Sequence, residues 1–221
     1  MFRSIRSPEV LLTTLAAAGI LMVTMGARQS LGLFVAPINE STSLGIVTIS
    51  LALAVGQFTW GAMQPVAGAV ADRYGPRAVL ITGLVVLAIG SALTPFMTSG
   101  IGLIVSLGLL SAMGAGAGSF SVLIGAAAQR MPLEARGTAS GVINAGGSFG
   151  QFVFAPIIQK LISLFGWMGA MWSLALLTLT ALPLVGKLTR PGAAAPKHAE
   201  ADAGLKNTVV GAMPRAARAK R

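Results

Sequence analysis

Long apolar runs, separated by short polar or basic clusters, set the pattern of this chain. The first run covers residues 11–37 and contains a single charge, Arg28, and the second covers residues 41–71. A helix that crosses the hydrocarbon core of a membrane needs roughly 20 apolar residues. Each of these two runs is therefore predicted to be one membrane-spanning helix.

The later runs predict four more spans. Residues 78–129 carry no charge but are too long for one span, and Thr94-Pro95 followed by Thr98-Ser99-Gly100 divides them into a third and a fourth. Residues 137–159 and 161–186 supply the fifth and sixth. The runs are continuous rather than alternating, which favours helices over barrel strands. The prediction is an all-α membrane protein with six transmembrane helices.

Composition supports lipid as the solvent. Hydrophobic residues make up 54% of the 221 residues and charged residues only 10%, whereas roughly a quarter of a soluble domain is charged. The net charge of +10, taken alone, would be compatible with a nucleic-acid partner. The basic residues, however, form short clusters between apolar runs, so we expect no nucleic-acid binding. The chain has no cysteine, which excludes disulfides and thiol catalysis.

The basic clusters also predict orientation. They fall before span one, between spans two and three, between spans four and five, and after span six, so one side is strongly basic and is expected to be cytoplasmic. An even number of spans then places both termini inside. The predicted divisions are a cytoplasmic N-terminus (1–9), a six-helix transmembrane domain (10–188) and a disordered basic cytoplasmic tail (189–221).

One sequence motif lies between spans two and three. Residues 68–77 read GAVADRYGPR, which places Gly68, Asp72, Arg73, Gly75 and Arg77 at the positions of a known signature. This resembles the signature loop of the major facilitator superfamily, although Pro76 and Ala78 flank a single basic residue where the family often has two. We expect Gly68 to let the helix end pack closely and Gly75 to adopt a positive φ in a tight turn.

The resemblance implies a fold and a function class. In this family two six-helix halves, each an inverted pair of three-helix repeats, hold the substrate between them, and the signature loop latches the halves on the cytoplasmic side. The chain is similar to the N-terminal half. Gln64-Pro65 and the glycine-rich stretches 114–119 and 146–151 resemble bacterial monocarboxylate and oxalate/formate carriers. That similarity implies a location in a plasma membrane, here the bacterial inner membrane.

Arg28 is the only charge inside a span and is a candidate substrate-binding residue. An unpaired Arg inside a helix costs at least ~2.5 kcal/mol on insertion, so it should face protein or a water-filled cavity. No other span offers an acidic partner, and Arg suits a carboxylate because it can donate two parallel hydrogen bonds. The alternative is that Arg28 reaches the outer interface near Glu40.

Polar and small residues inside spans two and five are further candidates. Gln57 lies in span two, and Asn144, Ser148 and Gln151 share one helix face of span five. They are expected either to line a substrate cavity or to form interhelical hydrogen bonds, each worth ~0.6 kcal/mol. Small-residue pairs should allow close helix packing; these pairs are Gly114/Gly118, Gly137/Gly141 and Gly146/Gly150.

The expected function is secondary transport of a small organic solute, with an organic anion favoured by Arg28. No cofactor or metal is expected. The only histidine, His198, lies in the tail, so an intramembrane serine protease, or any enzyme, is disfavoured. The alternatives that remain open are a homodimer that completes the fold from two copies, a truncated or frameshifted fragment that does not transport, and a half-protein that needs a separate partner chain with the complementary six helices.

Overall fold

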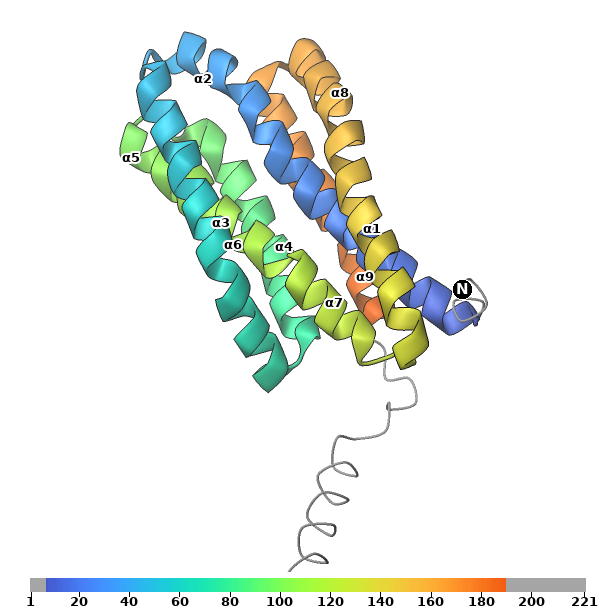
Figure 1. The fold of residues 1–221 in the computed structure, drawn as a ribbon. Helices are drawn as coiled ribbons and strands as arrows, with labels where there is room; N and C mark the ends of the chain where they lie inside the picture. Colours follow the sequence, from blue (N-terminus) through green and yellow to red (C-terminus); the bar gives the residue numbers. More distant parts are fainter. Residues whose placement is uncertain (1–6, 190–221) are drawn as a thin grey trace, which may run out of the picture. The chain divides into compact units, whose positions relative to one another are not determined.

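The computed structural model describes residues 7–189, and these form a bundle of helices (Figure 1). The chain begins with α1 (Pro8–Ser30), which continues through η2 (Leu31–Phe34) into α2 (Val35–Thr42). Ser43 and Gly45 then adopt positive φ and turn the chain into α3 (Ile46–Tyr74). The first two predicted spans are thus helical: the helical stretch Pro8–Thr42 covers 35 residues and α3 covers 29.

The third span is α4 (Pro76–Leu93), which ends in η3 (Thr94–Phe96). The non-helical residues 97–99 follow, as the Pro and Gly signals predict, and the Ser99 side chain accepts a hydrogen bond from Gly102 N to begin the next helix. The fourth apolar run is not one regular helix. It consists of α5 (Gly100–Leu103), the π-helix η4 (Ile104–Ser111), α6 (Ala112–Ala117) and α7 (Phe120–Ala128).

The last apolar region is α8 (Leu133–Leu179) followed by α9 (Leu182–Leu188). Gly166 interrupts α8 with φ 69° and ψ 173°. The sequence placed the break near residue 160, but the helix continues through Lys160, because nothing before Gly166 in this stretch favours a left-handed backbone. By length and hydropathy, five helical stretches within residues 7–189 can cross a membrane, with α8 and α9 counted as one.

The helices pack in two groups joined by α4. Helix α1 lies along α8 and α9, α3 lies along η4 and α6, and α4 contacts both sets. In Figure 1 the start of α1, the α3–α4 turn, the α7–α8 turn and the end of α9 lie at the same end of the bundle. This is the end where the sequence places the basic clusters.

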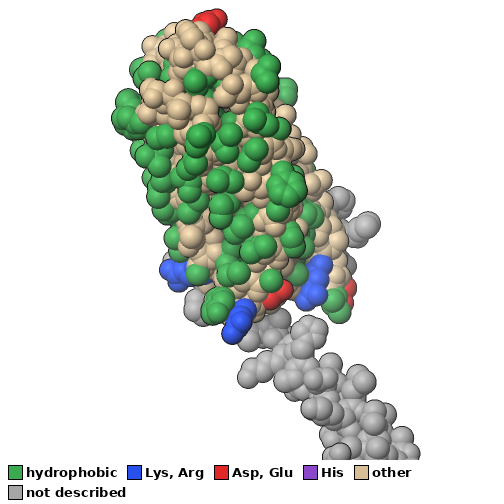
Figure 2. Space-filling model, turned by 90° about the vertical axis from the view of Figure 1, so that its left-hand side faces the viewer, with side chains coloured by type: hydrophobic (Ala, Val, Ile, Leu, Met, Phe, Trp, Pro, Cys, Tyr) green, Lys and Arg blue, Asp and Glu red, His purple; other side chains and the backbone are tan. Residues whose placement is uncertain are grey.

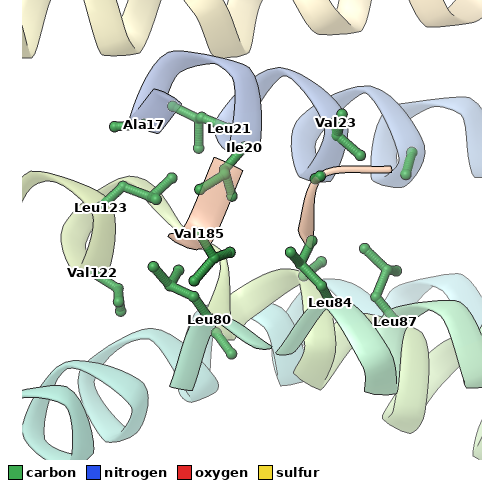
Figure 3. Packing of buried hydrophobic residues seen from close by; sticks show 14 of the residues in the cluster. Ala17, Ile20, Leu21, Val23, Leu80, Leu84, Leu87, Val122, Leu123 and Val185 are labelled. Atoms are coloured by element: carbon green, nitrogen blue, oxygen red, sulfur yellow. The ribbon is translucent and has the colours of Figure 1, made fainter. Parts of the chain in front are cut away.

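The core fills the space between α1, α4, α7 and α9. Figure 3 shows Ile20 and Leu21 of α1 pointing toward Leu80 and Leu84 of α4, with Val185 of α9 between them. All five side chains are buried. In a membrane, the lipid tails that surround helices are as apolar as a leucine side chain. Close packing, rather than removal of apolar surface from water, therefore holds such a core together.

Candidate functional site

Arg28 lies near the end of α1 and reaches across to α3. Its Nη1 donates a hydrogen bond to Gln57 Oε1 (2.5 Å), and its guanidinium carbon lies 4.1 Å from the centroid of the Trp60 ring. Gln57 and Trp60 are three residues apart and therefore share one face of α3. Arg28 is thus held against one face of α3, through a hydrogen bond and a cation–π contact.

Part of the Arg28 guanidinium is not used by these contacts. Among residues 7–189, its Nε is buried and has no hydrogen-bond partner. The side chain lines a cavity of about 300 Å³ that is bounded by α1, η2, α3, α4, η4 and α6. The cavity is lined by Arg28, Gln29, Leu31, Gly32, Leu53, Gly56, Gln57, Leu87, Leu107, Ser111 and Ala112.

Three polar or aromatic residues at this site were not found from the sequence. Gln29 and Ser111 line the cavity and Trp60 supports Arg28. Ser111 ends the π-helix η4, is 1% exposed, and its hydroxyl has no hydrogen-bond partner within residues 7–189. For Ser111 the useful signal would have been the π-helix, because such segments are frequent at functional sites. A π-helix leaves no clear mark in a continuous apolar run of the sequence.

The predicted residues of span five lie elsewhere. Asn144 and Ser148 are exposed on α8 and Gln151 is half-buried, and none of the three lines the Arg28 cavity. The opposite face of α8 is the one that packs in the bundle, because Gly146 and Gly150 lie against Ala18 and Met22 of α1. The structure therefore brings Arg28 and Gln57 together but does not bring the α8 residues to them.

The signature loop has the turn that the sequence predicted. Gly75 has φ 88°, and its N–H donates to Ala71 O (2.9 Å), closing α3 just before α4 begins. Arg73 lies over the Tyr74 ring at 5.4 Å. Asp72 lines a separate cavity of about 310 Å³ that also includes residues of α7.

The prediction for Gly68 was wrong within this chain. A Cβ placed on Gly68 would meet nothing within 4 Å, so no close helix contact requires a glycine there. The same is true of Gly137 and Gly141 on α8, whereas Gly114, Gly118, Gly146 and Gly150 all lie against neighbouring helices. The small-residue pairs therefore divide into those that pack within the bundle and those on open faces.

The geometry suits a small anion better than a metal. Within residues 7–189, no group of three His, Cys, Asp or Glu side chains is placed to hold a metal ion. Arg28 instead offers a fixed positive charge with planar N–H donors at the wall of a cavity, and such a group recognises carboxylates. Gln29, Gln57 and Ser111 add neutral polar groups around that charge.

Comparison with known proteins adds the family. The model of the Major Facilitator Superfamily matches residues 17–219. The chain is 33% identical to monocarboxylate transporter 13 of Rattus norvegicus over 173 residues (76% of this chain) and 32% identical to monocarboxylate transporter 11 of Mus musculus over 180 residues (80% of this chain). It spans 39% of the length of each.

A bacterial relative is more distant. The probable sulfoacetate transporter SauU of Cupriavidus necator is 30% identical over 126 residues, which are 56% of this chain and 29% of that protein. These relatives, the family match and the long apolar helices agree with one another. The chain belongs to the major facilitator superfamily and is a multi-pass membrane protein.

Proposed function

We propose that this chain forms half of a secondary transporter that moves a small organic carboxylate by alternating access. One observation carries the proposal: Arg28 is fixed by Gln57 and Trp60 at the wall of a cavity inside the apolar helices. A charge among apolar membrane-spanning helices is energetically costly unless it interacts with a ligand or with another polar group. The relatives named for monocarboxylate and sulfoacetate transport support an anionic solute.

The site chemistry favours binding over catalysis. Arg28 supplies the charge, Gln57 orients it, and Trp60 shields one face of the guanidinium from water. Ser111 and Gln29 lie where they can select among anions by hydrogen bonding. We place Asn144, Ser148 and Gln151 on the α8 surface that would meet a second half, where they would line the shared substrate path.

The proposed topology has six crossings. Gly166 divides α8, and Figure 1 shows the chain reversing there, so residues 133–165 and 167–188 would each cross once. Three helices followed by three more would form the inverted 3+3 repeat. Arg73, Arg130 and Lys187 would then mark the cytoplasmic side, which gives N-in and C-in in a bacterial inner membrane. The proposed tail, 189–221, lies outside the described residues except Thr189.

The loop 68–77 would act as the latch between halves on that side. Gly75 fixes its turn, and Asp72 lies at a cavity shared with α7. Arg73 and Arg77 are exposed there. Gly68 lines the same cavity as Asp72.

A second candidate is a half that does not transport alone. The chain spans 39% of the length of monocarboxylate transporters 13 and 11, to which it is similar. Helix α3 exposes bulky apolar side chains such as Val47 and Phe58. These would be covered by a second copy, by a separate chain, or by residues beyond the given sequence.

One experiment separates these candidates. The chain is purified in detergent, its mass is measured, and it is reconstituted into vesicles for uptake of labelled small monocarboxylates and dicarboxylates. Arg28→Ala is compared with Lys160→Ala, which removes an exposed charge near Gly166. A dimer whose uptake is abolished by Arg28→Ala alone supports a self-completing carrier. A monomer without uptake supports the half that needs a partner, and uptake that survives Arg28→Ala refutes the anion site.

A further inference from the structure

An apolar groove runs along the outer side of α3 and α4. Its volume is about 460 Å³, and it reaches from Met63 and Val86 to Tyr74 and Ala78, with Met113 of α6 along its edge. From residue 78 to residue 86 an α-helix rises about 12 Å. The groove is therefore long enough to hold part of an extended hydrocarbon chain, and it shares no lining residue with the cavity that holds Arg28.

One end of this groove is positively charged. Arg73 stacks on Tyr74, which lines the groove, and Arg77 directly precedes the lining residue Ala78. Both arginines are exposed. Asp72, the nearest acidic residue in sequence, lines a different cavity with residues of α7. Figure 2 shows one face of the molecule, with hydrophobic side chains along its length and Lys and Arg side chains, with Asp or Glu side chains among them, at one end.

We propose that this groove binds an anionic phospholipid of the surrounding bilayer, with an acyl chain between α3 and α4 and the phosphate at Arg73 and Arg77. Lipid tails are as apolar as the groove, so the groove alone cannot prefer one lipid class. The two arginines supply that preference, because basic residues at the membrane surface attract anionic headgroups and Arg pairs well with phosphate. The occupant is therefore selected by charge and positioned by the groove.

The test is native mass spectrometry of the full chain in detergent with added phosphatidylglycerol or phosphatidylcholine of the same acyl composition. We expect phosphatidylglycerol to be retained more strongly. The double variant Arg73→Gln/Arg77→Gln should lose this preference, by about fivefold for each arginine. Thr82→Trp, which fills the groove from an exposed position, should reduce retention of both lipids.

Matched controls separate the groove from general effects. Lys160→Gln removes one positive charge outside the groove, and Leu164→Trp introduces the same side chain on an exposed part of α8; neither should change retention. Equal retention of the two lipids, or a preference that survives the double arginine variant, overturns the proposal. So does a dimer that Thr82→Trp dissociates, because a second copy would then be the occupant. The arginine variants alter only exposed side chains, so the test stands if Thr82→Trp does not fold.

Discussion

Helices α1 and α3 are both long and apolar, but they meet their surroundings in opposite ways. In the most apolar window of the segment Pro8–Thr42, 67% of the residues are buried inside the bundle, against 17% in α3. Helix α1 packs closely against glycines of α8, whereas α3 directs Phe58 outward at 78% exposure. The comparison shows that hydropathy places a helix in the membrane but does not say whether lipid or protein covers it.

The two helices meet at Arg28, and this gives the comparison a functional meaning. The buried helix supplies the charge, and the exposed helix supplies Gln57 and Trp60 to hold it. The site therefore lies where the packed part of the bundle borders its open face. A ligand there would be reached from the side on which a second half is proposed to dock.

The largest expected effect comes from adding a methyl group to the α1–α8 contact. A Cβ on Gly150 would collide with the backbone carbonyl of Met22, which cannot move without separating the helices. Gly150→Ala should lower the free energy of unfolding by about 1–3 kcal/mol, as measured by denaturation in mixed micelles. Gly141→Ala, on the same helix with nothing within 4 Å, should be neutral or raise it by about 0.5–1 kcal/mol. Equal effects would mean that the contact is not close.

The next effect concerns the junction of the two helices. Trp60→Leu removes the aromatic face beneath Arg28 and should weaken carboxylate binding by about 0.5–2 kcal/mol, whereas Trp60→Phe should retain most of it. Titration calorimetry on the purified chain measures this. Trp172→Leu is the control, because Trp172 bonds to Ala92 O and lies outside the cavity. A loss shared by both Trp→Leu variants would assign the effect to general packing.

A smaller effect is expected at the end of the packed region. Arg130 donates from Nη1 to the carbonyls of Lys187 (3.1 Å) and Leu188 (2.7 Å), at the C-terminus of α9. A cation stabilises such a terminus by about 0.3–1 kcal/mol. Arg130→Gln should therefore speed hydrogen exchange of the last amides of α9 by a few-fold, while Lys160→Gln should not. Unchanged exchange would show that these bonds do not hold α9.

The smallest effect is expected on the open face. Phe58→Ala on α3 should change the free energy of unfolding in detergent by less than about 0.5 kcal/mol, because the side chain contacts little of the bundle. Leu176→Ala, exposed on α8, should behave alike. If a second half covers α3, Phe58→Ala alone should weaken the association measured by mass. A large loss of stability in the monomer would show that α3 is packed more tightly than its exposure indicates.

Much of the fold could be predicted because single residues carried the signals. Prolines and glycines marked the break at 97–99, and Gly75 adopted the positive φ that its place in the motif required. The break at Gly166 was misplaced, because a polar pair at 159–160 gives a stronger signal in the sequence than one glycine. The π-helix at Ile104–Ser111 was invisible, because hydrogen-bond register has no counterpart in an unbroken apolar run.

The sequence by itself determined that the chain is an all-helical membrane protein, that Arg28 stands alone inside a span, and which family it resembles. These features depend on composition and spacing along the chain. Only the tertiary structure decided that Gln57 and Trp60 hold Arg28, that Ser111 shares its cavity, and that Gly150 packs while Gly141 does not. The physical reason is that these contacts depend on how the helices are rotated and how closely they approach one another. Residues distant in sequence determine that arrangement jointly.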